Sequence, residues 1–172
     1  MPIDIDNRHP HLRVDQRRLA SHLRSILREV GQARSWVDIS LVTDAEIQQL
    51  NHEHRAVDAV TDVLSFALAE AGEAFEPVVM LGDIVISLDS AQRQAAALSA
   101  AHAASLAGAR YGLREETLFL ATHGLLHLLG HDHQERAAAH AMEALERRYM
   151  ATVTHLPVHE LDRSEHGLEG VP

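Results

Sequence analysis

The chain has 172 residues, of which 46% are hydrophobic and only 3% aromatic, and this predicts one globular domain with an aliphatic core. Its formal net charge of −10 counts against a general nucleic-acid binder, because non-specific phosphate contact needs a basic excess. The absence of cysteine excludes a disulfide scaffold and thiolate metal sites.

The N-terminal part alternates short strands with a helix. Residues 2–5 alternate in polarity and predict a short edge strand. After Asp15, apolar residues spaced three and four apart predict an amphipathic helix that ends near Gly31. Residues 36–42 alternate again, so we expect a second strand there.

A second helix follows this strand directly. Thr43 and Glu46 have the spacing of a capping box, in which each side chain satisfies a backbone N–H at the start of a helix. We expect this helix to continue through Asn51. Residues 52–60 are polar, and we expect them to form a loop.

Two further strands are predicted in the middle of the chain. Residues 63–68 and 78–88 are short apolar segments of the kind found in strands, and a loop should join them. Gly82 and Asp83 interrupt the second segment, which indicates a bulge or a close approach of another backbone.

The C-terminal half is predicted to be helical. The expected helices run from Asp89 or Ser90 to about Ala107, over 115–129, and from Ala137 to about Thr152. The second is apolar on nearly every side, so it should be buried. We therefore predict an α+β fold in one domain, 1–154, with a small mixed sheet of about four strands packed with about five helices. Residues 155–172 form a polar tail that should be loosely held.

The chain is expected to be cytoplasmic and free of membrane association. Its first residues, MPIDIDNRHP, are polar and acidic and do not resemble a signal peptide. Its longest apolar run, LFLATHGLLHLLG, is too short and too rich in histidine to span a bilayer. The lack of cysteine fits a reducing compartment.

The segment HGLLHLLGHDH predicts a metal site. His123 and His127 are four residues apart, so on a helix both rings leave the same face. Gly130 can end that helix in a left-handed conformation and reverse the chain, which would bring His133 toward the first two rings. A catalytic zinc ion is typically held by three protein ligands, such as three imidazoles, and keeps its fourth position open.

Two other interpretations of the cluster stay open. The spacing is shared with zinc peptidases, but Gly124 stands where those enzymes carry the glutamate that activates water. A metal with an open position can activate water by itself, so the missing glutamate does not exclude catalysis. Alternatively, a fourth ligand such as His54 or His155 would close the site and make the zinc structural.

With these residues in view, the chain resembles the YbeY family of endoribonucleases. The resemblance is carried by HGLLHLLGHDH, by Leu50-Asn51 through Arg55 with TDVLSF at residues 61–66, and by LGDIVIS at residues 81–87. These motifs stand in the family's order and cover about residues 36–150. The alanine-rich helix near residues 95–109 and the tail depart from the family pattern.

The resemblance implies an activity and a set of partners. It implies one zinc ion per chain on His123, His127 and His133, and cleavage of single-stranded RNA. It further implies maturation of the 3′ end of small-subunit ribosomal RNA, ribosome quality control, and contact with the small subunit or with ribosome-associated proteins. Arg55 matches the family's functional arginine.

Several residues near the predicted site carry more than one interpretation. Arg55 can clamp developing negative charge on a phosphate, or it can form an ion pair with Asp58 or Asp62. Asp132 can orient a ligand histidine or simply stabilise the turn. The remaining candidates are His131, as a weak general base or a turn residue, and Asp62 and Ser65, which are expected to shape the cleft floor.

Overall fold

The protein structure, a computed structural model, describes residues 3–68 and 80–156. Its elements run in the order β1 (Ile3–Asn7), α1 (Gln16–Glu29), β2 (Trp36–Val42), α2 (Asp44–Arg55), β3 (Val63–Ala67), β4 (Met80–Ser87), α3 (Leu88–Ala101), α4 (Leu113–Leu128) and α5 (Arg136–Met150). The predicted loop after β3 and most of the predicted polar tail lie outside the described residues.

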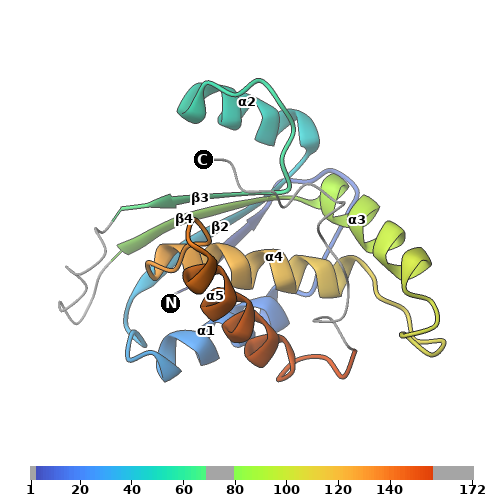
Figure 1. The fold of residues 1–172 in the computed structure, drawn as a ribbon. Helices are drawn as coiled ribbons and strands as arrows, with labels where there is room; N and C mark the ends of the chain where they lie inside the picture. Colours follow the sequence, from blue (N-terminus) through green and yellow to red (C-terminus); the bar gives the residue numbers. More distant parts are fainter. Residues whose placement is uncertain (1–2, 69–79, 157–172) are drawn as a thin grey trace.

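The strands form one mixed sheet in the order β1-β2-β4-β3. β1, β2 and β4 are parallel, and β3 pairs antiparallel with β4 at one edge. Figure 1 shows the sheet close to edge-on, with α2 over one face and α1, α4 and α5 beneath the other. The predicted α+β architecture, a small mixed sheet packed with helices, is confirmed.

α4 lies at the centre of the main core, as its apolar residues on nearly every side predict. Leu23 of α1, Ile39 of β2 and Ile84 of β4 belong to this core and are at most 1% exposed. Burial of each such side chain stabilises the fold by about 1.5–3 kcal/mol, so α4 is a rigid base for a site. Within the described residues, no helix is long and apolar enough to cross a membrane.

α2 rests on a second, smaller core. Val42, Ile47, Leu64 and Val85 are buried between this helix and the sheet, with Phe66 packed beside them. These side chains come from three strands and from α2 itself, so they hold α2 against the face of the sheet opposite α4.

α2 is longer than predicted. It ends at Arg55, so the prediction of a loop from residue 52 is wrong for residues 52–55. This last turn is polar because it is solvated, and its basic side chains suit the negative end of the helix dipole. Ala56 then adopts a left-handed φ of 56° and ends the helix.

α3 is shorter than predicted. It ends at Ala101, and turns rather than helix follow to Gly108. Alanine favours helix, but most helical stability in proteins comes from tertiary packing of an apolar face. After Leu98 the next large apolar side chain is Leu106, so little burial supports a longer helix.

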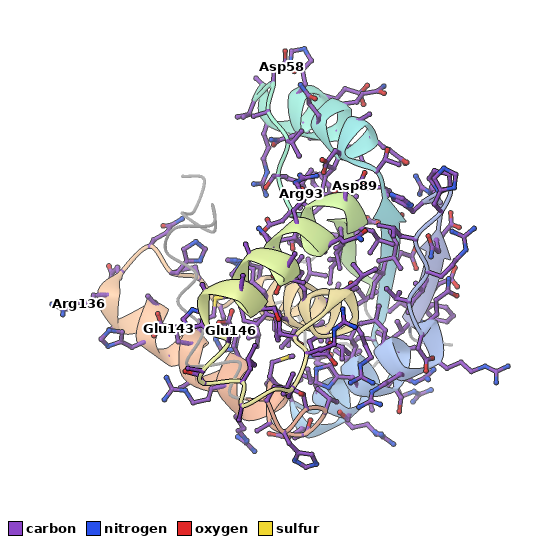
Figure 2. All side chains as sticks on the ribbon, turned by 90° about the vertical axis from the view of Figure 1, so that its right-hand side faces the viewer. Asp58, Asp89, Arg93, Arg136, Glu143 and Glu146 are labelled. Atoms are coloured by element: carbon purple, nitrogen blue, oxygen red, sulfur yellow. The ribbon has the colours of Figure 1, made fainter. Side chains whose placement is uncertain are left out.

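A polar network joins the first turns of α2 and α3. Asp44 accepts hydrogen bonds from the hydroxyls of Ser87 and Ser90, at 2.6 and 2.7 Å, and pairs with Arg93 at 2.7 Å. Asp89 accepts the backbone N–H of Asp44 at 3.0 Å. Figure 2 shows Asp89 and Arg93 at the end of α3 that faces α2. The network therefore fixes where α2 begins over the sheet.

Gly82 of β4 lies close to the backbone of β3 and pairs with Ala67. A Cβ at this position would overlap the backbone oxygen of Phe66, and its φ of 144° disfavours other residues. The pairing of β4 with β2 also shifts register between Trp36 and Val37. The predicted bulge and the predicted close backbone approach are both present.

His22 is a buried histidine of the main core, 3% exposed. Its Nε2 lies 2.9 Å from the hydroxyl of Thr122, which itself donates to the carbonyl of Leu118. The hydroxyl therefore accepts a hydrogen bond from Nε2–H, and Nδ1 of His22 is buried with no partner among the described residues. Burial lowers the pKa of His22 to about 4, with a smaller effect from the charge of Arg18.

We expect acid to destabilise the fold through His22. Below pH 6.5, the ordinary pKa of histidine, His22 binds a proton in the unfolded chain. In the folded chain it stays neutral until the pH falls to about 4. The free energy of unfolding therefore falls by about 3 kcal/mol as pH falls through this range. Urea unfolding with chelator present, at neutral pH and near pH 4, measures the loss. His22→Gln should lose correspondingly less, and equal losses in both proteins would refute this assignment.

Candidate metal centre

Three histidines converge where α4 ends. His123 and His127 lie one turn apart on α4, so their rings leave the same side of the helix. After the helix, Gly130 takes a left-handed φ of 87° and the chain turns back toward α4. This turn brings His133 to the other two rings, and one nitrogen from each ring lies within 4.8 Å of the others. These are the three residues that the sequence predicts as metal ligands.

The distances between the rings suit one small cation. Nε2 of His123 and Nε2 of His127 are 3.1 Å apart, whereas two nitrogens bound tetrahedrally to zinc at about 2.0–2.1 Å are separated by about 3.4 Å. The ring centroid of His133 lies 5.8 Å from that of His123 and 5.1 Å from that of His127. Small ring movements would bring the three nitrogens to a shared ion.

Hydrogen bonds outside the cluster orient its rings. Nδ1 of His123 donates to Oε1 of Glu146 on α5 at 2.7 Å, since a carboxylate can only accept. The ring of His127 bonds to the backbone of His131. Nδ1 of His133 is buried with no hydrogen-bond partner among the described residues, a costly state that a bound metal would relieve. The donor set and this orphaned nitrogen fit a divalent metal.

The surroundings of His127 favour its neutral imidazole form. Burial, with smaller contributions from repulsion by His123 and His133, lowers the pKa of His127 to about 4. Metal binding requires the neutral ring, because a protonated nitrogen has no free electron pair. At neutral pH, a metal ion therefore has no proton to displace from His127.

The described part of the chain supplies three ligands to the cluster and leaves one position open. Among the described residues, no further histidine or carboxylate joins the three rings as a ligand. The ring of His54 lies against Phe66, with centroids 4.9 Å apart, and His155 is exposed. Three protein ligands with an open position are typical of a catalytic zinc site rather than a structural one.

Gly124 packs α4 directly against the sheet. A Cβ there would lie 2.9 Å from Cγ2 of Ile84 and 3.0 Å from Oγ of Ser65. A longer side chain at this position would therefore meet β3 and β4 instead of the metal cluster. The glutamate of the peptidase pattern has no room here, which argues against peptidase chemistry.

Arg55 is exposed at the C-terminal end of α2, the helix that Figure 1 shows on the opposite face of the sheet from α4. Within the described residues it forms no hydrogen bond or ion pair. Its two alternative partners are engaged elsewhere, because Asp58 accepts from Gln48 and Asp62 accepts from Gln94. The guanidinium is available to a ligand, but no such bond links it to the three histidines.

The two candidates between the glycine and the third ligand act mainly through the turn. Asp132 is exposed and accepts the backbone N–H of Gln134 at 3.2 Å, which stabilises the turn. Its carboxylate makes no hydrogen bond to a ligand histidine within the described part of the chain. His131 contributes its backbone to the site through the bond to His127.

Ser65 lies on β3, and Asp62 comes directly before this strand. The Ser65 hydroxyl donates to the carbonyl of Gly124 at 3.4 Å, so this serine supports α4 from the sheet. Asp62 is buried, and it accepts hydrogen bonds from the backbone of Val63 and from Gln94, at 2.8 and 2.9 Å. Ser65 therefore joins β3 to α4, and Asp62 joins the start of β3 to α3.

Glu146 is the site residue that sequence analysis misses. Its side chain is only 12% exposed and contacts a ligand histidine. The sequence does hold a signal, because Glu146 stands among the apolar positions Met142, Leu145 and Tyr149 of an amphipathic helix. A carboxylate beside the buried face of a helix needs a partner, but the sequence alone cannot say that the partner is His123.

Comparisons with known proteins find relatives of this chain. A profile of the family described as Endoribonuclease YbeY matches residues 4–154. Endoribonuclease YbeY of Moorella thermoacetica is 44% identical over 124 residues, which cover 68% of this chain and 72% of that protein. The Thermus thermophilus protein of the same name is 40% identical over 134 residues, which cover 78% of this chain and 88% of its own length.

A solved structure supports the fold. The solution structure of a Thermotoga maritima protein matches with a TM-score of 0.53 at 24% identity, over 86% of each chain. The family profile spans the three histidines, Arg55 and Glu146.

Proposed function

Because this chain belongs to the YbeY family of endoribonucleases, we propose that it is a metal-dependent endoribonuclease that cleaves single-stranded RNA. The observation that carries the proposal is the convergence of three imidazole nitrogens within 4.8 Å, with no fourth ligand among the described residues. An all-nitrogen site with an open position suits metal-assisted hydrolysis. The missing glutamate at Gly124 makes the peptidase alternative the weaker one.

Zinc is the metal that we propose for this site. His123, His127 and His133 would hold it, and nickel or cobalt could accept the same nitrogens. When bound, the metal would supply Lewis-acid stabilisation of charge on phosphate oxygens and would activate water. The protein's own part is to keep the ring of His127 neutral, which its burial favours, and to align the ring of His123, which its hydrogen bond to Glu146 favours.

The proposed substrate context is the ribosome. We propose that the enzyme matures the 3′ end of small-subunit ribosomal RNA in the cytoplasm and acts in ribosome quality control. A formal net charge of −10 opposes tight binding of bare RNA. The small subunit or a ribosome-associated protein should therefore deliver the substrate. Sub-micromolar binding of bare single-stranded RNA at physiological salt would contradict this dependence on a partner.

One experiment separates the candidate activities. The purified protein is incubated with single-stranded RNA, double-stranded RNA and casein, each with and without a chelator. Cleavage of single-stranded RNA alone, abolished by the chelator and restored by zinc, supports the proposal. Cleavage of casein, or RNA cleavage that survives metal removal, would reject it.

Arg55→Ala is expected to keep the metal and lose most of the activity. The exposed guanidinium carries five fixed donors that can stabilise negative charge on a phosphate in the transition state. Loss of one such interaction lowers the turnover of RNA by about 100- to 1000-fold. Metal content and single-turnover cleavage rates measure the two properties separately.

Arg110→Ala is the matched control for this variant. Arg110 is also exposed, and it lies just before α4, at the end of that helix away from the histidines. The Arg110→Ala variant loses the same positive charge as Arg55→Ala, so it should cleave RNA at the wild-type rate. Wild-type activity in Arg55→Ala, or equal losses in both variants, would remove Arg55 from the proposed mechanism.

A further inference from the structure

Glu146 of α5 forms a hydrogen bond to the metal centre. Its Oε1 lies 2.7 Å from Nδ1 of His123, and the two side chains are 12% and 16% exposed. The bond joins two successive helices, α4 and α5, on the two sides of the turn that carries His133. In such a setting a charged carboxylate is costly unless it has a strong partner.

The direction of this hydrogen bond fixes the tautomer of His123. An ionised carboxylate has no proton to donate, so the proton must sit on Nδ1 of the ring. Nε2 then carries the free electron pair, and Nε2 is the atom that faces His127 at 3.1 Å. If the proton moved to Nε2, His123 could not bind a metal through that atom.

We propose that Glu146 is a positioning residue that presents Nε2 of His123 to the metal. It selects the tautomer, holds the ring at a fixed angle and makes the imidazole a stronger electron donor. The inference rests on the metal-binding part of the proposed function. It gives α5 a role in the site that the sequence pattern of the histidines does not reveal.

A purely structural role for Glu146 is the competing explanation. The bond could serve only to dock α5 on α4. However, α5 already buries Met142, Tyr149 and Met150 in the main core. These large side chains provide the apolar contact that holds the helix, so the docking of α5 does not depend on one hydrogen bond.

The test compares Glu146→Gln with Glu143→Gln. Figure 2 shows the two glutamates on the same helix, and Glu143 is exposed with no contact to the histidines. Each variant removes one negative charge from α5 and keeps the side-chain volume. Zinc is titrated into the metal-free proteins against a competing chelator. We expect about 10- to 100-fold weaker zinc binding for Glu146→Gln and wild-type binding for Glu143→Gln.

A second measurement does not depend on a variant. Heteronuclear NMR of the histidine side-chain nitrogens in metal-free wild type, at mildly alkaline pH, reports the tautomer of each ring. His123 should carry its proton on Nδ1, and in Glu146→Gln the Nε2–H form should become populated. A proton on Nε2 of His123 in the wild type would overturn the inference.

The outcomes separate this inference from the proposed function. If wild type and Glu146→Gln bind zinc equally tightly, the positioning role is overturned and the metal centre stands. Wild type that binds no zinc overturns the metal centre itself. Equal thermal unfolding temperatures of the two glutamine variants, together with weaker zinc binding in Glu146→Gln alone, support positioning over docking.

Discussion

His127→Ala is expected to lose both the bound metal and the cleavage of RNA. His127 is the middle ring of the cluster, with its Nε2 3.1 Å from Nε2 of His123 and its centroid 5.1 Å from that of His133. Zinc in four-ligand sites is bound with about 10–16 kcal/mol, so one ligand contributes several kcal/mol. Affinity should fall by at least about 100-fold, and activity should fall with it.

The measurement uses metal analysis after dialysis and RNA cleavage in the same preparations. His140→Ala is the matched control, because His140 is exposed on α5 and lies outside the metal cluster. It should retain one metal ion per chain and wild-type cleavage. If His127→Ala still held one metal ion per chain after dialysis, the ion would be bound elsewhere. The assignment of His127 as a ligand would then be wrong.

The metal cluster could be predicted from sequence because its geometry is local. Two ligands share one helix, and their spacing fixes which face they share. The third follows a glycine whose left-handed φ of 87° is the conformation that glycine adopts most readily. No information from distant parts of the chain is needed to bring these three rings together.

The parts of the site that involve other elements could not be predicted in the same way. The pairing of Glu146 with His123 depends on how α5 lies across α4, which is decided by side-chain packing over the whole core. The length of α2 was missed because a polar last turn of a helix and a polar loop have the same composition. Arg55 was therefore expected on a loop, whereas it sits at the end of a helix.

Gly124→Glu is expected to destabilise the protein severely and to create no peptidase. The new side chain would start 2.9 Å from Cγ2 of Ile84 and 3.0 Å from Oγ of Ser65, in space that the sheet already fills. Overpacking of this kind costs about 1–3 kcal/mol, and burying an unpaired carboxylate adds further cost. The sum should exceed about 3 kcal/mol of unfolding free energy.

Gly124→Ala separates the size of the side chain from its charge. Alanine raises helix propensity by about 1 kcal/mol, but its Cβ still presses on the branched carbon of Ile84, which cannot swing away as a chain end could. We expect a net loss of about 1–2 kcal/mol in urea unfolding, much smaller than that of Gly124→Glu. Gln134→Glu, which adds the same carboxylate at an exposed position after the turn, should keep wild-type stability. Equal stability of Gly124→Glu and Gln134→Glu would contradict this prediction. The close packing of α4 on the sheet would then not explain why position 124 lacks the glutamate of the peptidase pattern. Selection for a different reaction would be the better explanation.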